Sequence, residues 1–138
     1  MTNRQLNLAT AQRLVTAVVD AATTQGIAVA VTVIDRGGHP LASARMDGLA
    51  YPFLEVSRRK AVTGSSFGSP THMLSRYFAQ DPVLASGSQA LTEFLFLPGG
   101  FPVLLDAQCV GGLGIAGGRN TQDQDLGEHA LAILQTQE

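Results

Sequence analysis

Residues Ile27–Asp35 read IAVAVTVID, and this stretch decides the class of the fold. Its three valines alternate with alanine, threonine and isoleucine, so a β-strand here is apolar on both faces. Such a strand belongs in the middle of a sheet that is covered on both sides. The glycines Gly37 and Gly38 follow as a tight turn, and residues 40–46 are predicted to return as the antiparallel partner.

The flanking sequence supplies the other elements. Apolar residues recur at three- and four-residue steps over residues 8–25, between Asn7 as an N-cap and Gly26 as a stop signal. Near the other end of the chain, Thr121 and Gln124 have the spacing of a capping box that opens a final helix. Between them, periodicity and turn residues predict helices over 52–66 and 70–79, a loop over 81–87, and strands over 91–97, 101–106 and 110–116.

Length and composition agree with one folded unit. The chain has 138 residues and a mass of 14.5 kDa, which is the size of one domain. We therefore expect a single domain over 1–138 with an α+β fold, a five-stranded and mostly antiparallel sheet with helices packed on it. Hydrophobic residues make up 45%, which excludes intrinsic disorder. Charged residues make up only 14%. Because so few charges cover the surface poorly, we expect a homo-oligomer.

Charge and cysteine usage exclude several classes of protein. The net charge is −2 and the nine basic residues are scattered, which disfavours nucleic acid as a partner. The single cysteine, Cys109, cannot form an intrachain disulfide or a thiolate metal cage. No apolar run approaches the ~20 residues of a membrane-spanning helix, and the residues after Met1 lack the apolar core of a signal peptide. We therefore expect no membrane partner and a cytoplasmic location.

Lys60 and Arg45 are candidate anchors for an acidic ligand. Lys60 is the only lysine, and on a helix it shares a face with Phe53 and Phe67. It either extends beside Phe53 into solvent or lines a pocket, where it pairs with a ligand carboxylate. Arg45 ends the predicted second strand, where a guanidinium either holds a carboxylate by two parallel hydrogen bonds or pairs with a nearby acidic residue.

The glycine-rich segment 111–118 is a candidate nucleotide loop. However, Gly112, Gly114 and Gly117 lack the spacing of a dinucleotide fingerprint, and no phosphate-loop lysine accompanies them. We interpret the segment as a strand that packs closely against a helix or a neighbouring subunit.

Three histidines bear on a metal or cofactor site. His39 lies in the predicted turn, His72 in the first turn of the third helix and His129 on the final helix. Their spacing matches no helical metal-ligand motif. A haem iron needs only one imidazole or methionine as an axial ligand, so His39, His72 and Met46 remain open as axial candidates.

Several ordered blocks of the chain resemble the GlcG/HbpS family. The first is DRGGHPL at 35–41 with RMDG at 45–48, which is similar to the D-x-G-G-H-x-L…R-M-D-G segment of that family. The later blocks follow in the family's order: Lys60–Ala61, Phe67–Thr71, Pro98–Pro102, Val110–Ile115 and Gln122–Asp125. The resemblance covers residues 6–134, nearly the whole chain.

This resemblance implies a profilin-like layered domain that forms dimers or higher oligomers. The family includes a secreted haem-binding, redox-sensing accessory protein and the C-terminal haem-binding domain of PduO-type corrinoid adenosyltransferases. The chain departs from the secreted type because it lacks the E-x-x-E pairs: Glu55 is followed three residues later by Arg58, and Glu93 by Phe96. His72 and Glu93 also stand where typical members carry other residues.

By resemblance, the first functional hypothesis is a small-ligand-binding protein whose ligand is haem or a related tetrapyrrole. An apolar crevice bounded by Phe53, Phe67 and Leu97 would hold the macrocycle, and Arg45 or Lys60 would meet its propionates. The complete ligand-binding set in this hypothesis is Arg45, Lys60, Phe53, Phe67, His39, Met46, Gly99 and Gly100.

Two alternatives belong to other classes. One is an enzyme of isomerase, lyase or hydrolase type that acts by acid–base chemistry on a small carboxylate-bearing metabolite. Arg45 and Lys60 would anchor that substrate, and the catalytic set would be Lys60, His72, Glu93 and Asp47. The other is an oligomeric accessory protein without a cofactor.

Overall fold

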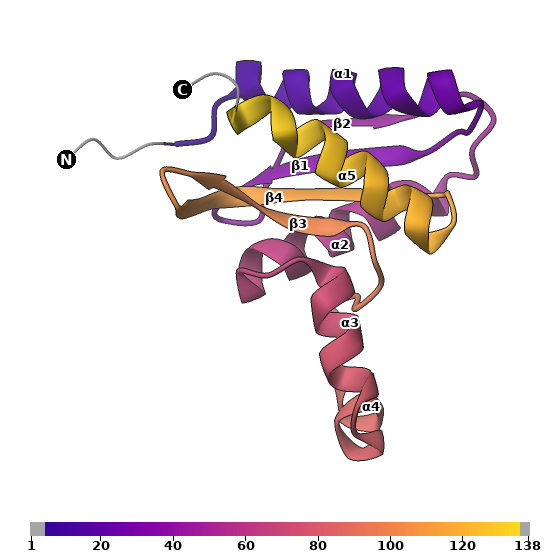
Figure 1. Ribbon diagram of the computed structural model, residues 1–138, viewed down its shortest axis with the longest axis vertical. Helices are drawn as coiled ribbons and strands as arrows, with labels where there is room; N and C mark the ends of the chain where they lie inside the picture. The colour runs from indigo at the N-terminus through magenta and orange to yellow at the C-terminus, as the bar shows by residue number, and fades with distance from the viewer. Residues whose placement is uncertain (1–4, 136–138) are drawn as a thin grey trace.

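The computed structural model describes residues 5–135, and within them four strands form one sheet with helices on both faces (Figure 1). The sheet has the order β2-β1-β4-β3, and every neighbouring pair is antiparallel. The elements in chain order are α1 (Leu8–Gln25), β1 (Ala30–Asp35), β2 (Pro40–Arg45), α2 (Pro52–Phe67), α3 (Thr71–Ala79), α4 (Pro82–Ser88), β3 (Gly100–Leu105), β4 (Gln108–Ala116) and α5 (Asn120–Gln135).

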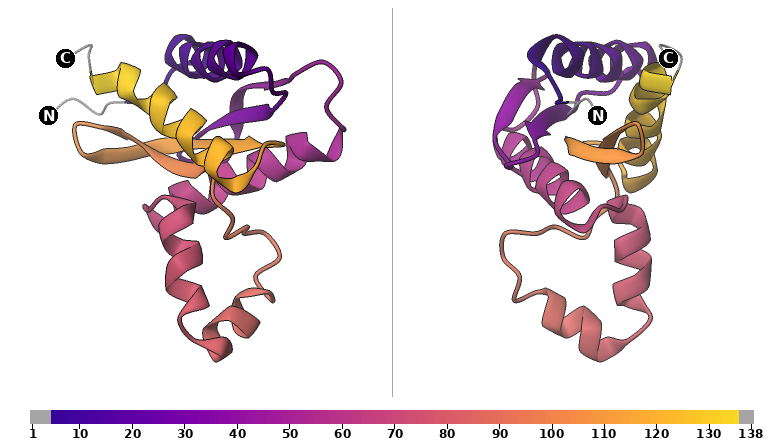
Figure 2. Two further views of the ribbon diagram at one scale, coloured as in Figure 1. Left: turned by 45° about the vertical axis from the view of Figure 1, so that its right-hand side comes forward. Right: turned by 90° about the vertical axis from the view of Figure 1, so that its left-hand side faces the viewer.

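The main hydrophobic core lies between the sheet and the pair α1 and α5, which share one face (Figure 2). Asn7 caps α1, because its side chain accepts a hydrogen bond from the Thr10 amide. The predicted apolar stripe of α1 is buried, and the valines of β1 face it. A fully buried side chain of this kind contributes about 1.5–3 kcal/mol, so this layer dominates the stability of the fold.

Helix α2 covers the opposite face at very short range, as expected from the glycine-rich segment. A Cβ atom added at Gly112 would overlap the Ala61 carbonyl, and one added at Gly114 would overlap the Ser57 carbonyl. The Ser57 and Thr32 hydroxyls also share a 2.7 Å hydrogen bond between α2 and β1. Gly112 and Gly114 therefore allow α2 to pack closely on the sheet.

Residues 71–97, which we call the arm, project away from the layered body on the side of α2 (Figures 1 and 2). The arm consists of α3, α4 and a return segment, residues 89–97. Helix α2 is followed by its C-cap Gly68, whose φ of 63° is the left-handed conformation that suits glycine. At the base of the arm, the Thr71 hydroxyl contacts the Leu97 carbonyl at 2.5 Å and accepts from the Gly100 amide at 2.8 Å. Thr71 thus ties the outgoing helix to the returning chain.

The α+β class and the antiparallel pairing are confirmed, but the fifth strand predicted over 91–97 is wrong. The aromatic residues of this segment, which suggested a strand, pack against α2 and α3 instead. Its backbone is bonded by side chains: the Leu95 amide donates to the Thr63 hydroxyl, and Arg59 donates to the Thr92 and Phe94 carbonyls. The profilin-like label stays a prediction.

Two smaller expectations also differ from the structure. The loop predicted over 81–87 contains α4, whose N-cap Asp81 accepts from the Val83 amide. At the start of α5, the predicted pair Thr121 and Gln124 is replaced by the side chains of Gln122 and Asp123, which accept from the Arg119 and Gly118 amides. No helix in the described part of the chain has the length and apolar character needed to cross a membrane.

Candidate functional site

The arm borders an open hollow of about 710 Å³, which we call the arm cavity. This volume lies within the roughly 300–1,000 Å³ typical of small-molecule sites. The lining comes from α2, α3, α4 and the return segment, and it consists of Arg59, Ser75, Phe78, Ala79, Ala85, Ser88, Gln89, Leu91, Thr92, Phe94, Leu95, Phe96 and Leu97. Arg59 is the one charged residue in this lining.

Aromatic rings form one wall of the arm cavity. Phe67, at the end of α2, packs edge-on against Phe94 and Phe96, with ring centroids 5.2 and 5.5 Å apart. Phe78 of α3 packs on Phe96 at 4.5 Å. Edge-to-face pairs at such distances contribute about 0.5–1.5 kcal/mol beyond their burial. These rings therefore fix the return segment against two helices. Three of them, Phe78, Phe94 and Phe96, give the cavity an apolar surface.

Arg59 is held in place by the return segment. Its Nη2 donates to the Thr92 carbonyl and, at 3.4 Å, to the Phe94 carbonyl. The preceding residue, Arg58, is engaged elsewhere, because its guanidinium binds Glu55 through two hydrogen bonds of 2.7 and 2.8 Å. Those bonds lower the pKa of Glu55. Of these adjacent cations, only Arg59 lines the cavity.

His72 lies in the first turn of α3, where the arm leaves the body. Its ring is half-buried and stands 6.0 Å from the ring of Phe101, centroid to centroid. The buried Nδ1 atom has no hydrogen-bond partner among the described residues. A buried polar atom without a partner costs about 1–3 kcal/mol. This nitrogen therefore has hydrogen-bonding capacity that no described residue uses.

Lys60 meets a carboxylate that belongs to the chain itself. Its Nζ donates to Asp123 Oδ2 at 3.1 Å and to the Ile115 carbonyl at 2.8 Å, and both charged side chains are at most 4% exposed. Burial lowers the pKa of Lys60 and raises that of Asp123, while the attraction between the two charges opposes both shifts. The pair connects α2, β4 and α5. The predicted role of Lys60 as an anchor or catalytic group stays a prediction.

Gly99 and Gly100 lie against this ion pair. A Cβ atom at Gly99, whose φ is +115°, would stand 3.2 Å from Lys60 Nζ and 2.9 Å from Asp123 Cβ. A Cβ at Gly100 would overlap the Lys60 carbonyl. Both glycines therefore allow the chain to pass directly over the buried lysine.

The residues predicted around Arg45 gather at another part of the molecule. Arg45 is exposed, and its Nη1 donates to the Leu49 carbonyl. The Met46 sulfur accepts from the Val29 amide at 3.3 Å, and Asp47 is exposed. The structure thus gives Arg45 a backbone acceptor. Both predicted roles of Arg45, as a ligand anchor and as a partner in an ion pair, stay predictions.

His39 lies in the β1–β2 turn with a side chain that is 82% exposed. Its Nδ1 is 3.5 Å from Asp35 Oδ1, and the same carboxyl oxygen accepts from the Gly37 and His39 amides. The hydrogen bond from the His39 amide is the largest of the effects that lower the pKa of Asp35. A second hollow, of about 510 Å³, adjoins this turn and is lined in part by Asp35 and Arg36.

The crevice predicted between Phe53, Phe67 and Leu97 does not form, because Phe53 and Phe67 lie at opposite ends of α2. Phe53 and Phe67 are fourteen residues apart on one helix, a separation of roughly 21 Å. Phe67 joins the aromatic wall and Leu97 lines the arm cavity, whereas Phe53 is exposed at the far end of α2.

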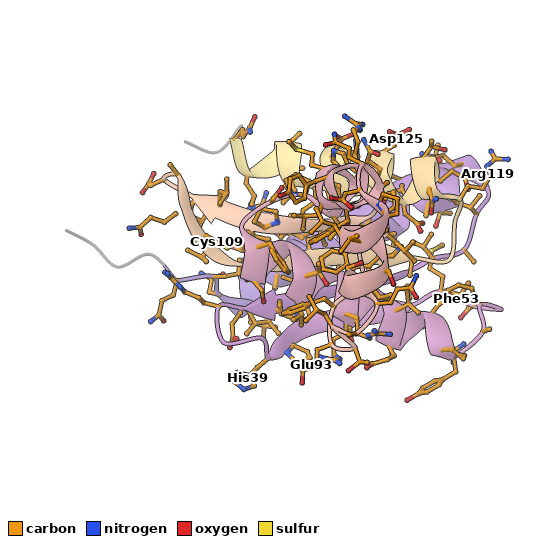
Figure 3. The ribbon with its side chains drawn as sticks, turned by 90° about the horizontal axis from the view of Figure 1, so that it is seen from below. His39, Phe53, Glu93, Cys109, Arg119 and Asp125 are labelled. Atoms are coloured by element: carbon orange, nitrogen blue, oxygen red, sulfur yellow. The ribbon has the colours of Figure 1, made fainter. Side chains whose placement is uncertain are left out.

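Figure 3 also shows Phe53 well separated from His39, and Glu93 on an exposed part of the return segment. Asp47 and Glu93 keep their predicted catalytic roles only as predictions.

Sequence reasoning missed Arg59, Asp123 and the ring pair Phe94 and Phe96. The two phenylalanines do give a signal in the sequence, because aromatic residues at alternate positions are typical of a strand. Arg59 carries no such signal, because it lies off the helix face that Lys60 shares with Phe53 and Phe67. Within residues 5–135, no three His, Cys, Asp or Glu side chains gather into a group that could hold a metal ion.

Comparison with known proteins gives the family. The sequence model described as "Haem degrading protein HbpS-like" matches residues 6–132. The chain belongs to the HbpS-like family. This result confirms the resemblance inferred from the sequence blocks.

Solved structures and a curated relative agree with this assignment. Protein ORFY of Klebsiella pneumoniae is 31% identical, with a TM-score of 0.90 over 100% of this chain and 97% of that one. The PduOC:heme complex is 27% identical, with a TM-score of 0.85 over 94% of each chain. The corrinoid adenosyltransferase PduO of Salmonella typhimurium is 28% identical over 123 residues, which span 88% of this chain and 37% of that longer protein.

Proposed function

We propose that this HbpS-like chain binds haem or a related tetrapyrrole, and that the arm cavity is the binding site. The observation that carries the proposal is the arm cavity itself, an aromatic-lined space of about 710 Å³ with one cation in its wall. A tetrapyrrole is a flat apolar ring system with carboxylate side chains, so it matches both features. The likeness to a PduOC:heme complex supports the same ligand class.

The chain's own residues fit the needs of a haem iron. Haem supplies an iron that takes an axial imidazole or thioether ligand. Among the three axial candidates, the Met46 sulfur already accepts a backbone hydrogen bond, and His39 lies on the β1–β2 turn, outside the lining of the arm cavity. His72 offers an unpartnered nitrogen, and it precedes the cavity residues Ser75 and Ala79 by three and seven positions on α3. We therefore favour His72 as the axial ligand.

A hemin titration followed by absorbance tests this proposal. We expect a saturable shift of the Soret band at a stoichiometry of one hemin per chain in the wild-type protein. The shift should change in position in His72→Ala and stay as in the wild type in His39→Ala. A weak shift that never saturates, and that is equal in all three proteins, would refute specific haem binding.

We further propose that the protein is a homo-oligomer, in agreement with the low content of charged residues. The arm exposes large apolar side chains to solvent, among them Met73, Tyr77 and Val83, the last at 78%. Such a concentration of apolar surface is typical of an interface. Light scattering should give a mass of at least two chains, and Val83→Glu should lower it. A mass near 14.5 kDa at micromolar concentration would contradict this proposal. The cytoplasmic location stays a prediction.

A further inference from the structure

Arg59 is the one charged residue in the lining of the arm cavity, and we infer that it recognises a carboxylate of the ligand. We infer that the site accepts planar apolar carboxylic acids as a class, with or without a metal at the centre of the ring. This inference rests on the proposed function, because it concerns the ligand class of the same cavity. It replaces Arg45 and Lys60 as carboxylate anchors by a residue that the sequence did not single out.

The first step of the argument concerns which cations are available. Lys60 is buried against Asp123 and the Ile115 carbonyl, so its charge is already matched inside the protein. Arg45 is bonded to the Leu49 carbonyl at the end of β2, outside the lining of the arm cavity. Arg59 is the charged residue that lines it. A carboxylate in the cavity therefore meets its counter-charge at Arg59.

The second step concerns geometry. The contacts of Arg59 with the Thr92 and Phe94 carbonyls both use Nη2, whereas a guanidinium carries five N–H donors. The remaining donors suit a carboxylate, which is held best by two parallel hydrogen bonds. Because the carbonyls of Thr92 and Phe94 already fix the side chain, binding a ligand costs little additional side-chain entropy.

The third step concerns what the cavity lacks. Its lining contains no histidine, cysteine, methionine or tyrosine, so none of the described residues within it is a usual iron ligand. The lining therefore provides an apolar surface and a cation for the ring and its carboxylates, and His72 at the base of α3 contributes only when iron is present. An iron-free ring should consequently still bind saturably, and it should lose only the contribution of the bond between iron and His72.

Titrations of three porphyrins into four matched proteins test this inference. The probes are hemin, protoporphyrin IX and the dimethyl ester of protoporphyrin IX, and the proteins are wild type, Arg59→Gln, Arg59→Lys and Arg58→Gln. Arg58 is the matched control, because it is the adjacent arginine on α2 and binds Glu55 outside the cavity. Binding is followed by quenching and shift of porphyrin fluorescence, or by the Soret band for hemin.

We expect Arg59→Gln to weaken hemin and protoporphyrin IX by roughly tenfold or more, as for loss of a charge-assisted hydrogen bond at a half-buried site. Arg59→Lys should recover part of the loss, and Arg58→Gln should match the wild type. The ester carries no carboxylate, so it should bind the wild type and Arg59→Gln equally.

Each remaining outcome overturns a defined part of the argument. Equal weakening of the ester and the acid by Arg59→Gln would mean that Arg59 acts through the packing of the arm and not through a carboxylate. Unchanged binding of both acids to Arg59→Gln would reject Arg59 while leaving the proposed function intact. Absence of saturable binding by any of the probes would reject the proposed function as well.

Discussion

Truncating Asp123 should be the most damaging single change to the fold among its charged residues. Asp123→Ala leaves the Lys60 ammonium at 3% exposure with only the Ile115 carbonyl as a described partner. Breaking a buried ion pair by removing one partner costs about 3–5 kcal/mol, because the other charge stays buried without compensation. The Gly118 amide also loses its acceptor. We expect a loss of about 3–5 kcal/mol in the free energy of unfolding, a large part of the roughly 5–15 kcal/mol typical of a domain.

Urea unfolding followed by far-ultraviolet circular dichroism measures this loss, since the chain has no tryptophan for a fluorescence assay. Asp125→Ala is the matched control: Asp125 is exposed two residues further on α5 (Figure 3), and its loss should change stability by no more than about 0.5 kcal/mol. The double variant Lys60→Met with Asp123→Leu should recover most of the stability, because replacing both members of a buried pair by apolar residues is often neutral or stabilising. A loss below about 1 kcal/mol for Asp123→Ala, or a double variant as unstable as the single one, would refute the assignment of a buried, mutually compensating pair.

Three further predictions concern the turn, the helix-to-sheet contact and the arm. The pKa of Asp35 is lowered from 3.8 in the folded state, so the unfolded state takes up the proton at a higher pH than the folded state does. The free energy of unfolding should therefore decrease as the pH falls through and below 3.8. In Asp35→Ala the urea midpoint should depend less steeply on pH in that range, and an unchanged slope would contradict the turn geometry. Gly114→Ala should destabilise by about 1–3 kcal/mol or more in the same assay, because the new methyl group meets the Ser57 carbonyl. Gly87→Ala is its control within α4, where nothing lies within 4 Å of the added atom, and it should stabilise by about 0.5–1 kcal/mol.

The layered body could be predicted from the sequence because its signals are local. The strand read in Ile27–Asp35 exists as Ala30–Asp35, and both of its faces are covered as the apolar alternation required. Helix α2 begins at Pro52 as predicted and ends one residue later than expected, at Phe67. The glycine-rich segment of β4 packs closely against a helix, as predicted, since Gly112 and Gly114 each meet a carbonyl of α2.

The arm and the buried ion pair could not be predicted because their partners are distant in sequence. Phe94 and Phe96 have the composition of a strand, and only contact with Phe67, some thirty residues earlier, shows that they belong to a ring cluster. Asp123 lies in the first turn of α5, where an acidic side chain is expected to serve the helix dipole, a local role. Its carboxylate instead turns inward to Lys60, 63 residues earlier, because the sheet brings α2 and α5 to the two sides of Ile115 and Gly99.

The central claim, that the arm cavity holds the tetrapyrrole, is tested most directly by filling the cavity. Ala85→Trp places an indole in the cavity lining, and Ala132→Trp places the same side chain on the exposed side of α5 as a control. Hemin should saturate the wild type and Ala132→Trp equally, and its affinity for Ala85→Trp should fall by roughly tenfold or more because the space is occupied. Unchanged hemin affinity in a folded Ala85→Trp protein would contradict the claim and place the ligand elsewhere on the molecule.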